Sequence, residues 1–295
     1  MSVAPPDQNA QRPEVVRVDG RETHERLALD RGLHYGDGLF ETIACLNGRP
    51  RFLPLHLNRL AAGAVRLGLA PADRGELARE VQELAAGATR AVVKLLLTRG
   101  AAPSRGYAPT ASEPPTRLTL RYPWAVEDPA AAGEGVRVRL ATLRLGENPA
   151  LAGLKHCNRL EQVLARAEWT DPAIAEALLF SGSGALVSGT MSNVFIVHDS
   201  RLLTPRLDRC GVAGIMREVV LAVARAAGIA AEERRLEAAD LLRAEEVFLT
   251  NALTGIRPVR ELDGAPLVPG PLTRTLQARL APLLLSGAAP ANTDG

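Results

Sequence analysis

The segment WAVEDPAAAGEGV (residues 124–136) constrains the fold most, because it divides the chain into two unequal parts. It is rich in Pro, Ala and Gly and lacks hydrophobic periodicity, which is typical of a linker. A chain of 295 residues is long enough to form a domain on each side of it. We therefore expect a disordered leader (1–13), a small N-terminal domain (14–123), a linker (124–135), a large C-terminal domain (136–286) and a disordered tail (287–295).

Strand-like and helix-like stretches alternate on both sides of this segment, which indicates an α+β protein. Val- and Leu-rich runs bounded by Gly or Pro predict strands at 91–100, 116–123, 136–145 and 245–253. Apolar residues at helical spacing predict helices at 53–69, from Leu160 onward and, after a Gly-rich entry, over 211–229. The runs 176–180 and 192–197 flank a Gly/Ser turn and are expected to pair as a hairpin.

Composition and charge exclude several classes of function. The chain has 35 basic and 33 acidic residues, so there is no electrostatic case for binding nucleic acid. Its three cysteines show no CxxC spacing and its five histidines no metal-ligand spacing, so we expect neither a disulfide framework nor a metal. The first residues have no apolar segment typical of a signal peptide, and no apolar run is long enough to span a membrane. We expect a cytoplasmic protein.

One lysine, Lys155, stands just before the helix predicted from Leu160. Its neighbours include Leu154 and Cys157 rather than other charged side chains. A surface lysine is the usual reading, because lysine is rarely fully buried without a partner. The alternative is an amine whose surroundings keep it reactive for Schiff-base chemistry.

Three other places in the sequence suit a phosphate. Gly211 and Gly214 precede a helix whose N-terminal N–H groups and dipole would attract an anion, although such starts are often only structural. Arg59, one turn after His56, offers a guanidinium, unless the two form a solvated pair. Asn251 ends a strand, where its amide and free backbone N–H groups could add to a phosphate shell. A reactive amine together with phosphate ligands is what a pyridoxal phosphate enzyme requires.

Seven motifs then occur in one order: LDRGLHYGDGLFET (29–42), HLNRL (56–60), TRG (98–100), LAGLKHCNRLEQVLAR (151–166), SNVF (192–195), GVAGIMR (211–217) and NAL (251–253). Together they resemble the fold-type IV pyridoxal phosphate enzymes, the family of the branched-chain and D-amino-acid transaminases. Within that family, LKHCNRLEQVL, TPRLDRCGVAGIMR and RGY (105–107) are most similar to the 4-amino-4-deoxychorismate lyases. The resemblance covers nearly the whole chain apart from its two ends. It implies a homodimer of two-domain subunits, each with a small N-terminal α/β domain and a larger, β-barrel-like C-terminal domain with helices.

The resemblance also implies a role for individual residues. Lys155 would hold pyridoxal 5'-phosphate covalently and then move protons. The phosphate would be held by Arg59, by the start of the helix at Gly214, Ile215 and Met216, and by Asn251 with Ala252. The substrate would meet Arg105 and Tyr107 and, with less support from the motif, Tyr35. A mobile-loop arginine remains the alternative for Arg105.

The implied reaction converts 4-amino-4-deoxychorismate to 4-aminobenzoate and pyruvate, a step towards folate. One alternative is a transaminase of the same fold that acts on D- or branched-chain amino acids. The other is a homologue that binds the cofactor without catalysis.

One position departs from the family pattern. A glutamate usually stands five residues before the Asn of SNVF and pairs with the pyridine nitrogen of the cofactor, whereas this chain has Ser188 there. A hydroxyl cannot stabilise a protonated ring nitrogen as a carboxylate does, so the ring should withdraw electrons less well. Transamination depends on that withdrawal more than an elimination with an aromatic product does. Ser188 therefore favours the lyase.

Overall fold

The computed structural model describes residues 15–22, 27, 29–101, 106–109, 114–125 and 129–290. The chain separates into two compact units, of which unit 1 is Met1–Val126 with Lys155–Asn158 and unit 2 is Glu127–Leu154 with Arg159–Gly295. The first boundary lies inside the segment 124–135 that was expected to be a linker, and this segment also carries a short helix, α4 (Pro129–Gly133). The leader 1–13 and the last five residues of the expected tail, 291–295, lie outside the described residues.

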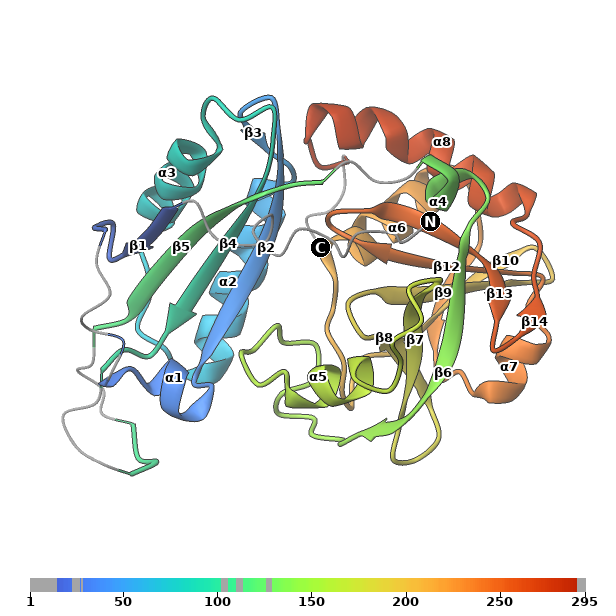
Figure 1. Cartoon of the computed structure of the whole chain (residues 1–295), viewed down its shortest axis with the longest axis horizontal. Helices are drawn as coiled ribbons and strands as arrows, with labels where there is room; N and C mark the ends of the chain where they lie inside the picture. Colours follow the sequence, from blue (N-terminus) through green and yellow to red (C-terminus); the bar gives the residue numbers. More distant parts are fainter. Residues whose placement is uncertain are drawn as a thin grey trace, which may run out of the picture. The chain divides into compact units, whose positions relative to one another are not determined.

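Unit 1 is one sheet covered by two helices (Figure 1). Its strand order is β1 (Val15–Val18), β5 (Thr116–Pro123), β4 (Arg90–Thr98), β2 (Gly38–Leu46) and β3 (Arg49–Pro50), and the described pairs are all antiparallel. Helix α2 (Leu53–Leu67) packs on β2, and α3 (Arg74–Ala85) packs on β3, β4 and β5. The short helix α1 (Arg31–Tyr35) precedes β2. The strands expected at 91–100 and 116–123 and the helix expected at 53–69 are confirmed.

The two faces of this sheet differ in burial. On β4, the alternate residues Val93 and Leu95 are completely buried, whereas Lys94 between them is only half-buried. On β2, Glu41 lies opposite Leu95 and faces α2, whereas Phe40 points to the other face. Alternation of side chains along a strand therefore sorts the residues of β2 and β4 into a helix-covered face and an open face.

Unit 2 is built on a curled mixed sheet. Its order is β11 (Ala231–Arg234), β10 (Arg201–Pro205), β9 (Asn193–His198), β12 (Glu246–Asn251), β13 (Gly255–Leu262), β6 (Val136–Leu145), β7 (Ile174–Ser181) and β8 (Leu186–Gly189), with β14 (Ala265–Pro266) beside β13. Strand β8, at one end of this order, contacts β9 and β10, so the sheet curls back on itself like a partial barrel. The strands expected at 136–145 and 245–253 are confirmed as β6 and β12.

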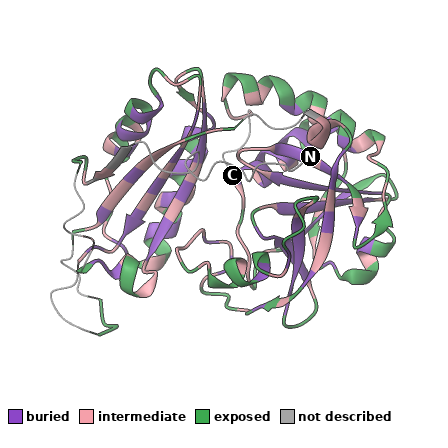
Figure 2. Ribbon diagram, in the orientation of Figure 1, coloured by how far each residue is buried: buried purple, intermediate pink, exposed green. Residues whose placement is uncertain are grey.

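Four further helices belong to unit 2: α5 (Leu160–Arg166), α6 (Ile215–Ala226), α7 (Ala238–Leu242) and α8 (Pro271–Ser286). Helix α6 packs on β11, β12 and α8, and α8 packs on β12 and β13. Figure 2 shows the strands largely buried, while much of the helix surface is exposed. No helix among the described residues is both long and apolar enough to cross a membrane.

The expected hairpin between 176–180 and 192–197 is wrong. Strand β7 pairs instead with β8, and β9 pairs with β10 and β12. The turn after Ser181, with Gly184 in the left-handed region, leads directly into the four-residue strand Leu186–Gly189. A strand this short, ending in Ser and Gly, has too little apolar pattern to be recognised before the structure is seen.

The helix expected from Leu160 is confirmed as α5, but its apolar side chains are not buried. Leu160, Val163 and Leu164 remain 68%, 61% and 53% exposed, whereas Ala165 is fully buried. The hydrophobic spacing thus predicts the helix correctly, but the apolar face that it predicts is not packed within the described chain.

Candidate functional site

The segment Lys155–Asn158 lies along the start of β2. Phe40 N donates to the carbonyl of Lys155 (3.0 Å), Cys157 N donates to the carbonyl of Gly38 (2.9 Å), and His156 bridges to Leu39. Asn158 Nδ2 adds a bond to the carbonyl of Gly36 (3.1 Å). The lysine is therefore held by an extended backbone pairing with β2 and not by helix α5, whose N-cap is Arg159.

The amine of Lys155 lies against an aromatic ring. Its Nζ is 4.3 Å from the ring centroid of Phe40, and Nζ of Lys94 lies 5.4 Å from the same centroid. These are the two lysines of a chain with 35 basic residues, and both approach one phenylalanine on the open face of the unit 1 sheet. Lys94 has no hydrogen-bond acceptor among the described residues. Sequence reasoning missed Lys94 and Phe40, although the rarity of lysine was a visible signal.

A buried ionic cluster lies on the opposite face of β2. The carboxylate of Glu41, 1% exposed, accepts from Arg59 Nε (2.8 Å) and Nη2, and lies 2.6 Å from His56 Nδ1. His56 is also 1% exposed, so a solvated His56–Arg59 pair is wrong. Arg59, the expected phosphate ligand, is thus oriented by a carboxylate that sequence reasoning did not identify.

Both titratable groups of the cluster, Glu41 and His56, have a lowered pKa. Burial opposes ionisation of Glu41, but the charges of Arg59 and His56 outweigh it and lower the pKa of Glu41 to about 2. Burial lowers the pKa of His56 and outweighs the opposing effect of Glu41, while the charges of Arg59 and Lys155 add to the lowering. Glu41 is therefore ionised and His56 neutral at pH 7, so His56 Nδ1 carries the proton and donates to Glu41. His56 Nε2 is buried and has no hydrogen-bond partner among the described residues.

Two expected substrate residues are in contact, and a third cannot be placed. The rings of Tyr35 and Tyr107 lie 5.3 Å apart, with Tyr107 83% exposed, while Arg105 lies outside the described residues. Arg31 holds both tyrosines: its guanidinium lies 5.0 Å from the Tyr35 ring, and its Nη2 donates to the carbonyl of Tyr107 (2.8 Å).

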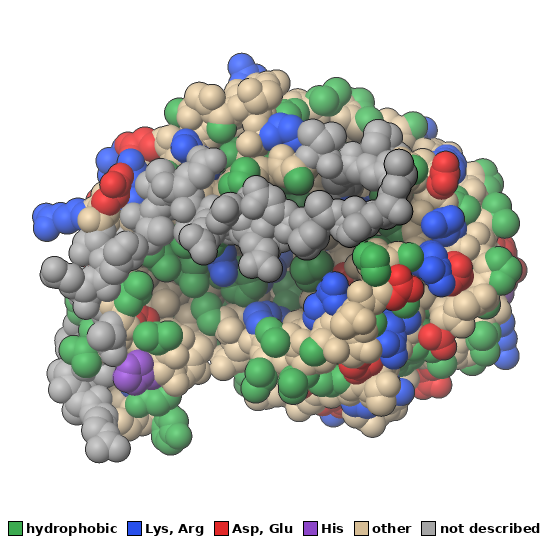
Figure 3. All heavy atoms as spheres, viewed as in Figure 1, with side chains coloured by type: hydrophobic (Ala, Val, Ile, Leu, Met, Phe, Trp, Pro, Cys, Tyr) green, Lys and Arg blue, Asp and Glu red, His purple; other side chains and the backbone are tan. Residues whose placement is uncertain are grey.

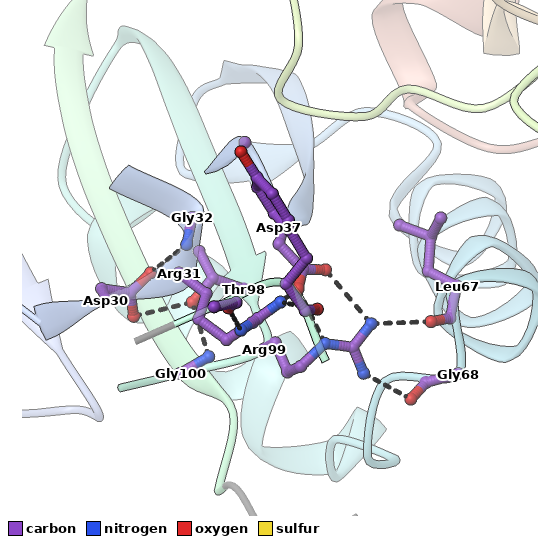
Figure 4. Close-up of polar contacts among 12 residues, drawn as sticks. Asp30, Arg31, Gly32, Asp37, Leu67, Gly68, Thr98, Arg99 and Gly100 are labelled. Atoms are coloured by element: carbon purple, nitrogen blue, oxygen red, sulfur yellow. Dashed lines mark hydrogen bonds and ion pairs between the residues drawn. The ribbon is translucent and has the colours of Figure 1, made fainter. Parts of the chain in front are cut away.

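Arg31 is itself part of a network at the end of β4 (Figure 4). Asp37 accepts from Arg31 Nε (2.9 Å) and from Arg99 Nε (2.8 Å). Burial opposes ionisation of Asp37, but hydrogen bonds from Arg99 and Arg31 prevail and lower the pKa of Asp37. Arg99 also donates to the carbonyls of Leu67 and Gly68 at the C-terminus of α2. The network fixes α1, β4 and α2 together.

In unit 2, the expected phosphate loop leads into α6. Gly214 is the N-cap of this helix without a side-chain cap, and Ile215 and Met216 are buried in its first turn. A Cβ at Gly214 would overlap with Oδ1 of Asn193, whose Nδ2 donates to the carbonyl of Val212 (2.9 Å). Asn193 therefore shapes the entry to the helix, where backbone N–H groups and the dipole suit an anion. Sequence reasoning used Asn193 only as part of a motif.

Asn251 ends β12, and its side chain organises the turn that follows. Its Oδ1 accepts from the backbone N–H groups of Leu253 (3.0 Å) and Thr254 (2.9 Å). Ala252 lies inside this turn. The side-chain oxygen is therefore committed to an Asx-type turn, which leaves its amide and the backbone for any ligand.

Ser188 lies on β8 and is 8% exposed. Its Oγ donates to the carbonyl of Gly189 (2.8 Å), so the hydroxyl offers only lone pairs to another group.

The loop after Ser188 is organised by Glu176 of β7, which the sequence did not single out. This buried carboxylate accepts from the backbone N–H groups of Thr190 (3.0 Å) and Met191 (3.1 Å) and from the hydroxyls of Thr190 and Ser192. Four donors to one carboxylate fix the path of the chain from Ser188 to Asn193.

The structure also brings together three possible metal ligands in unit 2 that their sequence spacing did not suggest. Ligand atoms of His198, Asp199 and Glu245 lie within 4.8 Å of one another. Asp199 and Glu245 are exposed, and the N–H of Asp199 already donates to Glu245 (2.9 Å). We assign no metal to them.

Comparison with known proteins gives a consistent family. The amino-transferase class IV family matches residues 38–262. Aminodeoxychorismate lyase from Vibrio harveyi is 35% identical over 269 residues, which cover 88% of this chain and 96% of that protein. A putative branched-chain-amino-acid aminotransferase from Methanocaldococcus jannaschii is 34% identical, covering 84% of this chain and 88% of that protein.

Solved structures agree. The crystal structure of 4-amino-4-deoxychorismate lyase from Pseudomonas aeruginosa superposes with a TM-score of 0.87 at 45% identity, covering 91% of this chain and 98% of that one. The expected two-domain fold is thus confirmed. With the family match extending over most of the chain, the protein belongs to the amino-transferase class IV family.

Proposed function

We propose that this chain is a pyridoxal phosphate-dependent lyase that converts 4-amino-4-deoxychorismate to 4-aminobenzoate and pyruvate. The observation that carries the proposal is the similarity to two lyases of this kind, at 35% and 45% identity, over about nine tenths of the chain. The transaminase alternative rests on relatives such as the one from Methanocaldococcus jannaschii.

The described residues fit the cofactor. When bound, pyridoxal phosphate supplies an aldehyde that condenses with amines and a ring that withdraws electrons. Unit 1 would supply the Lys155 amine and the Arg59 guanidinium, which Glu41 holds in a fixed orientation. The phosphate would meet the N-terminus of α6, where Gly214 avoids the overlap with Asn193 that a side chain would cause.

Lys155 would then act as the base that removes a proton from C4 of the substrate as the enolpyruvyl group leaves. The Phe40 ring lies against its amine, with Nζ 4.3 Å from the ring centroid. Formation of the aromatic product supplies much of the driving force.

The substrate carries two carboxylates, and Lys94 is our candidate for one of them. Its ammonium lies over the same Phe40 ring as Lys155 and has no acceptor among the described residues. A charge-assisted hydrogen bond to a carboxylate would satisfy it. Tyr107 and Arg105 of the 105–107 segment remain proposals for the other carboxylate.

Ser188 supports elimination over transamination. Because its proton is donated to the Gly189 carbonyl, its oxygen would meet a ring nitrogen as a neutral acceptor without the charge of a carboxylate. The cofactor ring would then remain a weaker electron acceptor, which an aromatising elimination tolerates.

We further propose a cytoplasmic homodimer. The exposed apolar side chains Leu160, Val163 and Leu164 on α5 support a partner surface there. In the view of Figure 3, hydrophobic side chains are visible along the lower edge of unit 2, the region in which Figure 1 places α5. All three cysteines lie among the described residues and form no disulfide there, which agrees with a reducing compartment.

The direct test is to load the purified protein with pyridoxal phosphate, add 4-amino-4-deoxychorismate and follow the fluorescence of 4-aminobenzoate. We expect product with the wild type and none with Lys155→Ala. Parallel incubation with D-alanine or leucine and a keto-acid acceptor tests the alternative. Transamination without any 4-aminobenzoate would replace the lyase by the transaminase.

A further inference from the structure

Unit 1 carries a second cluster of cationic side chains, at the other end of its sheet from Lys155. The guanidinium carbons of Arg51 and Arg90 lie 4.9 Å and 4.2 Å from the ring centroid of Trp124. Arg51 lies between β3 and α2, Arg90 begins β4, and Trp124 follows β5. Three segments that are distant in sequence thus converge on one indole.

Arg51 is buried, and no anionic group among the described residues pairs with it. It is 8% exposed, its Nε is buried with no partner, and no carboxylate or carbonyl among the described residues accepts from its guanidinium. Burial and the neighbouring charge of Arg90 both lower the pKa of Arg51. A buried guanidinium is normally hydrogen-bonded or paired, because an uncompensated buried charge is unfavourable. Contact with the Trp124 ring compensates only part of this cost.

Arg90 connects this cluster to a hollow in the surface of unit 1. The hollow has a volume of about 380 Å³ and is lined by Ala86, Gly87, Ala88, Arg90, Ala91, Arg121, Tyr122 and Pro123. Its described lining carries two guanidinium groups and no acidic side chain. Within the described part of the chain, the Nε of Arg90 is buried without a partner, and its Nη2 makes one long contact, 3.5 Å, with the carbonyl of Ala125. The lining therefore favours a negatively charged ligand.

The start of helix α2 also favours a negatively charged ligand. Phe52, the residue after Arg51, is the N-cap of this 15-residue helix and provides no side-chain hydrogen bond, and the first turn contains no acidic residue. The positive end of the helix dipole is therefore not neutralised by its own sequence.

We propose that Arg51, Arg90 and Trp124 form a binding site for a small oxyanion, a carboxylate or a phosphate. Guanidinium groups bind both through paired N–H donors. The site is separate from the reaction centre: Phe40, which Lys155 contacts, and Leu46, which pairs with Arg90, are six residues apart on β2, roughly 20 Å of extended strand. This inference does not rest on the proposed function.

The test uses the full chain loaded with pyridoxal phosphate, so that the cofactor's own phosphate site is filled. Trp124 and Trp169 are the two tryptophans of the chain. Trp169→Phe therefore leaves Trp124 as the reporter of its own site. This protein is titrated with sodium phosphate, sodium pyruvate and sodium chloride at constant ionic strength, and Trp124 fluorescence is followed.

We expect a saturable change with phosphate, pyruvate or both, but not with chloride, and the active anion identifies the chemistry. Arg51→Gln and Arg90→Gln should weaken binding at least tenfold. Arg79→Gln, which removes a positive charge from a side chain 63% exposed on α3, should not. If Arg51→Gln does not fold, the binding affinity of Arg90→Gln alone tests the proposed site. Absence of saturation, an equal response to chloride, or unchanged binding in Arg90→Gln would overturn the site.

Discussion

Lys94 and Lys155 approach the Phe40 ring from different parts of the chain, β4 and the segment after residue 154. Each is a compact primary amine, in a chain whose other basic residues are arginines. A guanidinium is planar and remains protonated, so it cannot serve as a proton-accepting amine. At the residue scale, the proposed site would therefore separate two tasks, with Lys155 for proton transfer and Lys94 for charge recognition.

Lys94→Gln should raise KM for 4-amino-4-deoxychorismate by about 10- to 100-fold, the effect of losing one charge-assisted hydrogen bond. The value of kcat should change much less, because Lys155 is intact. Steady-state kinetics with the fluorescent product measures both constants. Lys94→Arg is the control, since it keeps the charge and should recover part of the KM effect. A fall in kcat alone would assign Lys94 to the chemical step instead.

Ser188→Glu tests the choice of reaction. A carboxylate at this position would stabilise a protonated ring nitrogen and strengthen electron withdrawal. Any side transamination should therefore rise more than the lyase rate, and both are measured on the same preparation. Ser188→Ala, which removes the hydroxyl without adding charge, should not increase transamination. Equal changes in the two rates would show that this position does not select the reaction.

At the element scale, β2 joins two sets of groups: its Phe40 side faces the lysines, and its Glu41 side holds α2 through His56 and Arg59. The resemblance pointed to Arg59 and Lys155, and hydrophobic spacing located β4, β5 and α2. Neither could reveal Glu41, because a single carboxylate inside a strand has no periodic pattern, and its partners lie 15 and 18 residues away. The short strand β8 was not predicted for a related reason, since its four residues are too few to show an apolar pattern.

The Glu41–His56–Arg59 cluster should make folding sensitive to acid. The pKa of His56 is lowered from 6.5, so the unfolded chain binds a proton below about pH 6.5 that the folded chain does not. Stability should therefore fall as the pH drops below 6.5. Glu41, with its pKa lowered from 4.5 to about 2, adds a second loss between those values.

Urea unfolding between pH 8 and pH 5 measures the His56 contribution. His56→Gln, which keeps a donor for Glu41 without titrating, should show a flatter pH profile over this range, even if it is less stable throughout. Identical slopes for the two proteins would contradict a neutral buried histidine.

Gly214→Ala tests the start of α6. The new Cβ would overlap with Asn193 Oδ1, while the backbone angles at Gly214 are accessible to any residue. We expect weaker binding of pyridoxal phosphate, by about tenfold, because the anion-binding end of the helix would have to shift. Gly182→Ala is the matched control, since its Cβ would approach the Leu145 carbonyl only to 4.0 Å. Cofactor affinity is measured by titration of the apoprotein.

At the scale of the whole molecule, the expected site residues occur in both units: Lys155 and Arg59 belong to unit 1, and Ser188, Gly214 and Asn251 belong to unit 2. The interpretation of residues 124–135 as a linker predicted that the chain divides into two units near residue 126. That interpretation could not predict that Lys155–Asn158 belongs to unit 1 and pairs with β2. The pairing depends on backbone hydrogen bonds to Gly38 and Phe40. Such pairings carry no side-chain signature.

The exposed apolar face of α5 leads us to predict that two subunits associate through it. Leu160, Val163 and Leu164 expose apolar surface that a monomer would leave in water. Leu164→Glu should place a charge in any interface formed there and shift the protein towards monomer, as measured by light scattering after size-exclusion chromatography. Val65→Glu is the control, because Val65 is 80% exposed on α2 of the other unit. If the wild type is a dimer that neither change disturbs, the dimer uses another surface, and the apolar face of α5 needs a different partner.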